Sequence, residues 1–319
     1  MKRLILFFSL CIVFLNAVAK VHQHFHPYKL KKWGITPANY SGITPIGEGF
    51  YAVVSDEEDE AGFYVWEIQI DSTTGKLISV QQQGWRGTGY PIDRDAEGIA
   101  FCPPRQSVFI SGEADQQILE HRLEGNLTGN ELRIPDSMTK NNIMSNRGFE
   151  ALGYDEKRQL FWTTTESNLR KDSTLQLRLQ SFGLDLQPRQ EIPYKLNPAQ
   201  SKRKGRDHYH GVVAVTPLQD STLLILEREA YIAKKYNGSR CWCSLFRFNT
   251  MTREKILLNE WKTRFTATNT RFANYEGMCL GPTLTDGRQT IVLVSDSQAG
   301  YGRGPWHLKD WLKIIILFF

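Results

Sequence analysis

Short apolar stretches separated by turn residues run through most of this chain, and they predict strands rather than helices. Stretches such as 107–111 and 290–295 are rich in Val, Ile and Phe, which favour strands. Gly, Pro, Asp and Asn gather between such stretches, and helix signals are weak everywhere. The pattern therefore predicts an all-β protein.

One short phrase recurs five times and gives these strands a larger period. It joins a polar residue to a small residue and then an apolar one, as in Glu97-Gly98-Ile99. Successive polar positions lie 56, 53, 60 and 66 residues apart. A period of this size, with several short strands in each unit, is typical of the blades of a β-propeller. The five polar positions are Ser41, Glu97, Glu150, His210 and Glu276.

Each of the first four repeats can be divided into four strands. The predicted strands are 42–47, 50–55, 62–70 and 76–83; 98–102, 107–111, 117–123 and 131–134; 150–154, 160–164, 175–184 and 190–194; and 211–216, 222–227, 243–248 and 254–259.

The fifth repeat shows only three strands, at 277–280, 290–295 and 311–318. We expect segment 28–35, which precedes the first repeat, to supply the missing outer strand and remove an exposed sheet edge. The sequence thus predicts a single propeller with five four-stranded blades, closed by an N-terminal strand. A sixth blade hidden in the longer fourth and fifth repeats is the alternative.

The first residues have the character of a secretory signal peptide. A basic start, Met1-Lys2-Arg3, precedes an apolar run over 4–15 and the small residues Ala17 and Ala19. The predicted division is therefore a signal peptide over 1–19 and a propeller domain over 20–319, exported to a periplasm or the cell exterior. Neither the apolar run nor the apolar end 314–319 is long enough for a transmembrane anchor.

Charge and cysteine content change this picture little. The formal charge of +5 falls to +3 without Lys2 and Arg3, which gives no reason to expect a nucleic-acid partner. The largely basic run 202–208 is expected to be a solvated loop, with attraction of an anionic substrate as the alternative. No pattern identifies an oligomer interface. Outside the leader we expect buried structural cysteines, with a long-range disulfide left open, at Cys102, Cys241, Cys243 and Cys279.

A second set of acidic residues follows the second predicted strand of each repeat. The first set lies at the start of strand one, so in an antiparallel pair both sets lie at the same end of the sheet. With strand one innermost, both sets would face one mouth of the propeller channel. The second set is Asp56, Glu113, Glu166, Glu227 and Asp296.

Carboxylates that converge in this way repel one another unless a cation, an arginine or a proton intervenes. Ca²⁺ is the expected cation, because it accepts many oxygen ligands in flexible geometry. Arg147 and Arg228 would hold an anionic substrate group. We assign catalysis to Glu150, Glu166 and His210, a histidine being suited to general-base work near neutral pH. The expected metal ligands are Asp56, Glu97, Glu113, Glu227, Glu276 and Asp296.

A plainer alternative is that acids in repeated turns cap the blade loops and bind nothing.

Several phrases resemble the phytase-like family, also called "esterase-like activity of phytase". They are Asp95-Ala-Glu-Gly-Ile-Ala100, Asn146-Arg-Gly-Phe-Glu-Ala-Leu152, Thr164-Thr-Glu-Ser167, Asn274-Tyr-Glu-Gly-Met278 and Leu293-Val-Ser-Asp-Ser-Gln298. The resemblance implies an exported bacterial propeller that hydrolyses a small-molecule ester or phosphoester. The Glu-Gly-apolar phrase is also similar to gluconolactonase and regucalcin propellers, where such a Glu binds a catalytic divalent metal. A non-catalytic binding propeller and a lactonase-like metal-dependent hydrolase are the alternatives.

Overall fold

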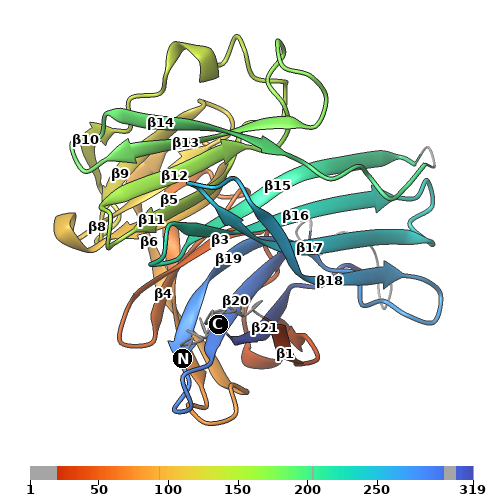
Figure 1. The fold of residues 1–319 in the computed structure, drawn as a ribbon. Coiled ribbons are helices and arrows are strands. Elements are labelled where there is room, and N and C mark those ends of the chain that lie inside the picture. Colours follow the sequence, from red (N-terminus) through yellow and green to blue (C-terminus); the bar gives the residue numbers. More distant parts are fainter. Residues whose placement is uncertain (1–19, 93, 203–204, 298–306, 319) are drawn as a thin grey trace, which may run out of the picture.

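Five antiparallel sheets surround one axis in the computed structural model, which describes residues 20–92, 94–202, 205–297 and 307–318 (Figure 1). The all-β, five-bladed propeller expected from the repeats is confirmed, and no sixth sheet occurs in the described residues. The predicted leader, 1–19, lies outside them. No helix of the described part has the length and apolar character needed to cross a membrane.

The first strand of each blade is innermost and the following strands are added outward. Blade 1 contains β3 (Tyr40–Gly47), β4 (Phe50–Ser55), β5 (Glu60–Ile70) and β6 (Leu77–Pro91). Blade 2 contains β7 (Ala96–Cys102), β8 (Ser107–Gly112), β9 (Gln117–Arg122) and β10 (Leu127–Glu131). Blade 3 contains β11 (Phe149–Asp155), β12 (Leu160–Thr165), β13 (Gln176–Gly183) and β14 (Pro188–Lys195). Blade 4 contains β15 (Asp207–Pro217), β16 (Thr222–Ile232), β17 (Ser239–Asn249) and β18 (Lys255–Phe265).

Blade 5 joins the two ends of the described chain. Its strands β19 (Asn274–Thr283), β20 (Gln289–Asp296) and β21 (Trp311–Phe318) are followed outward by β1 (Lys20–His24) and β2 (Tyr28–Lys29), which both pair with β21. Closure by an N-terminal strand is therefore confirmed. Of the predicted segment 28–35 only Tyr28–Lys29 pairs with β21, and the longer outer strand is β1, which precedes that segment. Residues Leu30–Trp33 form a 3-10 helix that ends at Gly34, and the buried Leu30 joins the core.

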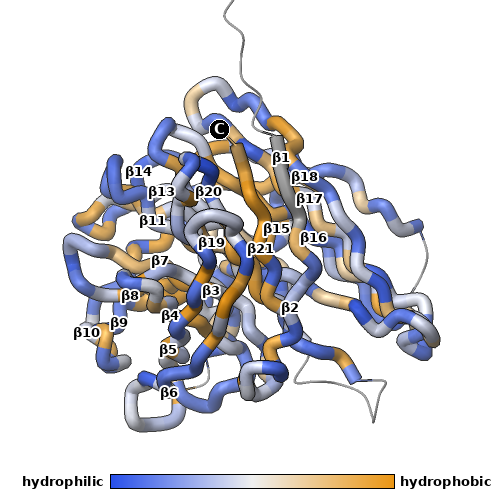
Figure 2. Tube along the Cα trace, turned by 90° about the horizontal axis from the view of Figure 1, so that it is seen from below, coloured by the Kyte–Doolittle hydropathy of each residue, from blue (hydrophilic) through white to orange (hydrophobic). Residues whose placement is uncertain are grey.

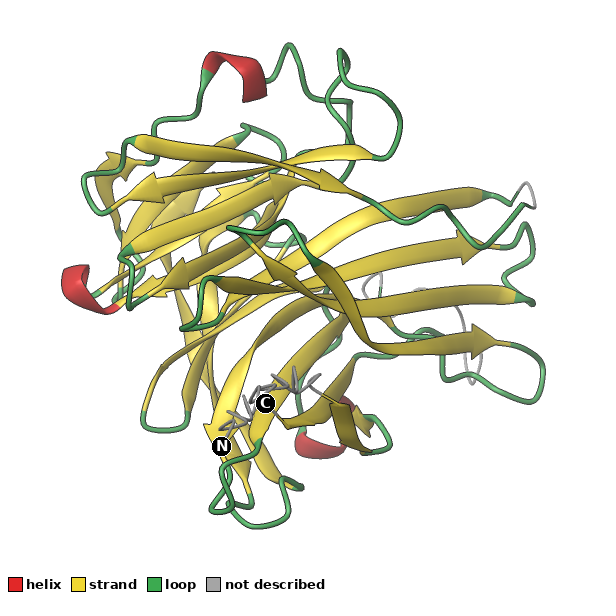
Figure 3. Cartoon of the chain, in the orientation of Figure 1, coloured by secondary structure: helices red, strands yellow, loops and turns green. Residues whose placement is uncertain are grey.

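Two further corrections concern strand positions. The outer strand of blade 2 is β10, four residues earlier than the predicted 131–134. All four strands of blade 4 are 11 residues long and extend beyond their predicted ends (Figure 1). Only two other short helices occur in the described residues, η2 (Pro103–Arg105) and η3 (Asp136–Met138) (Figure 3).

The core lies between neighbouring blades. Each apolar cluster takes side chains from two adjacent sheets, as where the Phe109 and Phe161 rings of blades 2 and 3 have centroids 4.4 Å apart. Apolar segments concentrate along the strands and polar ones in the connecting loops (Figure 2). Cys102, Cys241, Cys243 and Cys279 are all buried and free, as expected for structural cysteines.

The innermost strands contact one another in a closed ring, in the order β3, β7, β11, β15, β19 and back to β3. This ring explains the glycine in the recurring phrase. A Cβ atom on Gly42 would lie 2.5 Å from the carbonyl oxygen of Glu97, and one on Gly98 would lie 2.7 Å from that of Glu150. Backbones that approach so closely leave no room for a side chain.

We expect Gly98→Ala to lower the free energy of unfolding by about 1–3 kcal/mol, because the methyl group would push β7 away from β11. Chemical denaturation measures the loss. Ala151 occupies the corresponding position in blade 3, so Ala151→Gly is a matched control that should cost only about 0.5–1 kcal/mol. Equal stability of Gly98→Ala and the native protein would contradict the close-packed ring.

Candidate functional site

A cavity of about 200 Å³ opens at the end of the axis where the innermost strands begin and the second strands end. Eight carboxylates and two arginines line it. The full lining is Asn39, Asp56, Asp95, Glu97, Glu113, Asn146, Arg147, Glu150, Glu166, Tyr209, Arg228, Asn274, Glu276 and Asp296. We call this cavity the acidic mouth.

A β-bulge aims the first set of acids into the acidic mouth. The register between first and second strand shifts at Glu97, Glu150 and Glu276, and also at Ser41. A bulge leaves its extra residue outside the regular alternation and redirects its side chain. The recurring polar position is therefore the bulge residue of four blades.

In blade 4 the bulge lies at a different position, and His210 is therefore not part of the acidic mouth. Its bulge lies between Val212 and Ala214, so His210 pairs regularly with Glu229. The side chain is not part of the cavity lining, which Tyr209 joins instead. Burial lowers the pKa of His210 and favours the neutral ring. The predicted place of His210 on the channel rim is therefore wrong.

The same departure displaces Glu227. Because β16 continues to Ile232, Glu227 lies within the strand rather than at its end. Its carboxylate accepts a hydrogen bond from the Tyr194 hydroxyl (2.7 Å) and pairs with Lys255, between blades 3 and 4. The prediction of Glu227 as a mouth ligand is wrong, and the next residue, Arg228, faces the cavity in its place. A strand's side chains alternate, so one step decides which side they face.

The other predicted acids meet as expected. Asp56, Glu97, Glu113, Glu150, Glu166, Glu276 and Asp296 all line the acidic mouth, together with Arg147. The structure thus brings together nine of the eleven predicted site residues, counting Arg228, and separates His210 and Glu227 from them.

Arginines neutralise one side of the acidic mouth. Arg228 donates from Nη1 to Glu166 (2.9 Å) and from Nη2 to Glu276 (2.7 Å), and Arg147 donates from Nη1 to Glu166 (2.6 Å). The Arg228 side chain is 3% exposed and that of Arg147 is 24% exposed. Asn274 continues the network by donating to Glu276 and Asp296. Arg228 and Glu166 are therefore held within the protein, whereas Arg147 is open to a ligand.

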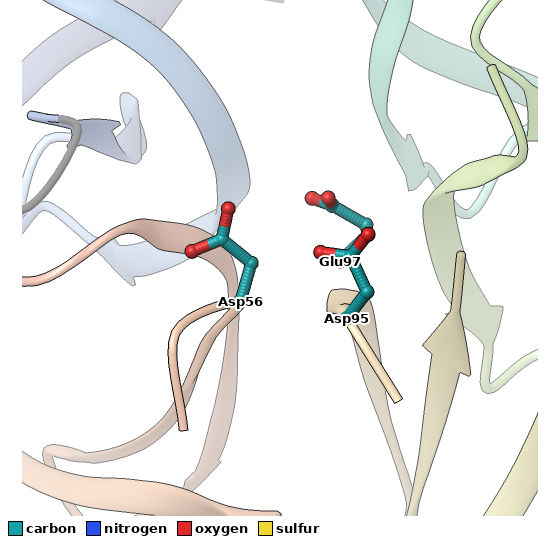
Figure 4. A group of neighbouring side chains, drawn as sticks. All are labelled: Asp56, Asp95 and Glu97. Atoms are coloured by element: carbon teal, nitrogen blue, oxygen red, sulfur yellow. The ribbon is translucent and has the colours of Figure 1, made fainter. Parts of the chain in front are cut away.

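Two other carboxylates of the acidic mouth have no hydrogen-bonding partner of this kind. Glu97 and Glu150 are each 8% exposed, and neither carboxylate takes a hydrogen bond or an ion pair from a described residue. Oxygens of Glu97, Glu113 and Glu150 lie within 4.8 Å of one another, as do those of Asp56, Asp95 and Glu97. Figure 4 shows the second group, with Asp56 facing Asp95 and Glu97 across the gap. Such a set of oxygens suits a hard divalent cation.

Burial and mutual repulsion favour the protonated form of these acids. Desolvation and the charge of Glu150 raise the pKa of Glu97 well above its usual range. Desolvation and Glu166 do the same for the pKa of Glu150, although the charge of Arg228 opposes this rise. Burial raises the pKa of Asp56 to about 9 and that of Glu276 to about 8, although Arg228 opposes the rise at Glu276. Protons or a cation are needed to relieve the repulsion among these carboxylates.

Five lining residues were missed in the sequence, namely Asn39, Asp95, Asn146, Tyr209 and Asn274. Three of them share a signal: Asn39, Asp95 and Asn274 each lie two residues before the recurring polar position. That spacing repeats in three blades and would have found them. Tyr209 has no such signal, because its place follows from the shifted bulge of β15.

A family model described as "Phytase-like: Esterase-like activity of phytase" matches residues 36–298. The chain belongs to this family. The match covers all five innermost strands and every residue that lines the acidic mouth. Among curated proteins, none matches the sequence.

Solved structures with similar folds are distant in sequence. An endo-arabinase from Bacteroides thetaiotaomicron has 12% identity and a TM-score of 0.51, and the match covers 89% of this chain and 95% of the arabinase chain. A thermostable family-43 glycoside hydrolase has 12% identity and a TM-score of 0.50, covering 92% and 93%. A tail fiber of Staphylococcus aureus phage P68 matches at 14% identity with a TM-score of 0.46, and the chain spans only 52% of its length. At these identities the likeness shows the propeller fold alone.

We expect Arg228→Met to lower the free energy of unfolding by about 3–5 kcal/mol, because it leaves Glu166 and Glu276 without their buried partner. Denaturant titration without added metal measures this. The control is Arg247→Met, which removes an exposed pair with Asp220 and should cost about 0–1 kcal/mol. A similar small cost for both variants would contradict the role of Arg228.

The raised carboxyl pKa values predict how stability depends on pH. The folded state binds protons more tightly than the unfolded state, so without metal stability should fall as pH rises from about 5 to about 9. Unfolding free energies measured in chelator across this range test the sign. Glu97→Gln with Glu150→Gln should flatten the slope, because the amides do not titrate. Stability that rises with pH by the same amount in both proteins would refute the assignment.

Proposed function

We propose that the protein hydrolyses a small anionic ester, foremost a phosphoester, in the acidic mouth and with a bound Ca²⁺. The observation that carries the proposal is the pair of buried carboxylates Glu97 and Glu150, which take no hydrogen bond or ion pair from a described residue and line the same cavity as two arginines. The carboxylates of the cavity are suited to a cation, and its more exposed arginine, Arg147, is suited to an anion. A substrate with a negatively charged group next to its scissile bond fits both.

The residues present fit a divalent cation. Glu97 is common to both carboxylate groups, with Asp56 and Asp95 on one side and Glu113 and Glu150 on the other. All these ligand atoms are oxygens, which favours Ca²⁺ over softer metals. A bound cation would act as a Lewis acid toward an ester or phosphoryl oxygen. The identity of the metal is part of the proposal.

Side chains of the protein would bind the substrate, transfer protons and position one another. Arg147, the more exposed arginine, would bind the anionic group of the substrate and orient it. Next to a bound cation the pKa of Glu150 would rise less, and its ionised form would be favoured. The Glu150 carboxylate would then accept the proton from the attacking water and return it to the leaving oxygen, a general-base and general-acid cycle. Glu166 and Arg228 are positioning residues, since each engages the other and both are almost fully buried.

A binding propeller without catalysis is the second candidate, and the lactonase-like hydrolase is the third. The arginine–carboxylate pairs support the binding propeller, because ion-pair networks with a purely structural role have the same arrangement. The lactonase would use the same carboxylates on an uncharged ring ester and would need Arg147 less. Turnover and its substrate distinguish the three.

We expect Ca²⁺-dependent turnover of p-nitrophenyl phosphate, phytate or p-nitrophenyl acetate, abolished by chelator. Glu150→Gln should lower kcat by about 10²–10⁴-fold, the usual contribution of a general base. A matched control is Glu156→Gln, which makes the same chemical change at an exposed site outside the cavity. It should leave kcat unchanged.

Calorimetric titration with Ca²⁺ separates binding from catalysis. Glu97→Gln should weaken Ca²⁺ binding, because Glu97 belongs to both carboxylate groups. Saturable Ca²⁺ binding with no turnover on any ester, phosphoester or sugar lactone would move the assignment to a binding propeller. Ring-opening of a lactone without phosphate release would identify the lactonase. Turnover unaffected by chelator would refute the role of the metal.

A further inference from the structure

We propose that the open face of blade 4 beside the acidic mouth binds an anionic polysaccharide. This basic face consists of Tyr231, Arg240, Trp242, Lys262 and Arg264. It goes beyond the proposed function and does not rest on it, because none of its residues lines the acidic mouth.

Strand pairing places these five side chains on one surface. Arg240 of β17 lies opposite Tyr231 of β16 and Arg264 of β18, and Trp242 lies opposite Lys262. Cross-strand partners share a face, as do residues two apart on one strand. The intervening residues Cys241 and Cys243 are fully buried on the other face.

The extended strands of blade 4 leave this surface open. The sheet formed by β15–β18 projects beyond the neighbouring sheets (Figure 1). Its inner side is covered by Phe265, Phe272 and Leu308, which belong to the cluster between blades 4 and 5. On the other side Lys262 and Arg264 are exposed, and Arg240 and Trp242 are partly accessible.

The three cations of the basic face form no ion pair with a described residue. The buried Glu229, which lies opposite Trp242 on the same face, partly offsets the positive charge around Lys262. Arg240 and Arg264 are directly opposed, a like-charge arrangement with Cβ atoms about 5 Å apart that destabilises a sheet. Neither they nor Lys262 form an ion pair with a described carboxylate, and Lys262 instead lies over the Trp242 ring at 4.3 Å. Burial and the charges of Arg240 and Arg264 lower the pKa of Lys262. An anionic ligand would relieve this repulsion.

The mixture of cations and aromatic rings favours a charged sugar polymer as the occupant. Arg240, Lys262 and Arg264 can pair with sulfate, phosphate or uronate groups, and Tyr231 and Trp242 offer flat apolar surfaces to sugar rings. Nucleic acid fits less well, because eight carboxylates of the adjoining acidic mouth would repel a uniformly charged phosphate backbone. A polysaccharide carries fewer charges and many neutral hydroxyl groups.

The basic face begins at the edge of the acidic mouth. Tyr231 pairs with His208 of β15, and the carbonyl oxygen of His208 lies 3.5 Å from Nη2 of Arg147. A polymer held on the basic face would therefore have its next residues beside Arg147. The face would keep the protein on a polymer whose substituents reach the cavity.

Affinity electrophoresis of the full protein through gels containing dextran sulfate, with chelator present, tests the proposal. The native protein should be retarded by dextran sulfate and not by neutral dextran. The triple variant R240Q/K262Q/R264Q should bind about tenfold more weakly, since charged contacts at such surfaces contribute this order of affinity. The control K31Q/K32Q/R253Q removes the same charge from exposed sites elsewhere and should bind like the native protein.

Each other result overturns the proposal. Absence of retardation, equal retardation by neutral dextran, or equal weakening of both triple variants would show that the basic face is not a specific site. Tighter binding to double-stranded DNA or to phosphatidylserine vesicles than to dextran sulfate would assign the face to another partner. Glu150→Gln should be retarded like the native protein, so a failure of the proposed hydrolysis leaves this binding result intact.

Discussion

The closed ring of innermost strands is the constraint on which the rest of the structure depends. Five strands, β3, β7, β11, β15 and β19, must approach closely enough that a side chain at Gly42 or Gly98 would meet the neighbouring carbonyl group. A bulge next to these glycines lets the chain turn inward and directs one side chain per blade toward the axis. Close packing and the convergence of acidic groups are therefore two results of one local geometry.

The convergence of carboxylates causes repulsion, and arginines and an asparagine form hydrogen bonds with only some of these acids. Arg228 and Arg147 satisfy Glu166 and Glu276, and Asn274 ties Asp296 into the same network. Glu97 and Glu150 remain buried without a partner. Evolution of a stable fold alone would favour pairing such groups or replacing them, because an isolated buried charge is costly. Their retention is what makes the acidic mouth a candidate site.

The two ends of the axis differ in chemistry. A larger cavity of about 350 Å³ lies at the other end, lined mainly by apolar side chains such as Ile99, Leu152 and Met278. Asp155 at its edge is already paired with Arg158. A small cavity of about 10 Å³ lies among the innermost strands, lined by residues such as Gly42, Gly98 and Gly277. The group of converging carboxylates is therefore a feature of the acidic mouth and not of the larger cavity.

Repetition in the sequence determined the fold and most of the site. The spacing of the Glu-Gly-apolar phrase predicted the five blades, and the acid after each second strand predicted that Asp56, Glu113, Glu166 and Asp296 lie with Glu97, Glu150 and Glu276. Only the tertiary structure decided the exceptions. In blade 4 the bulge lies three residues beyond His210. As a result Tyr209 and Arg228 line the acidic mouth, and the predicted His210 and Glu227 do not. The position of a bulge depends on how a strand packs against its neighbours in the ring, and side chains alternate along a strand. The recurring sequence phrase therefore predicts which residues approach the axis only in blades whose innermost strands pack in the same way.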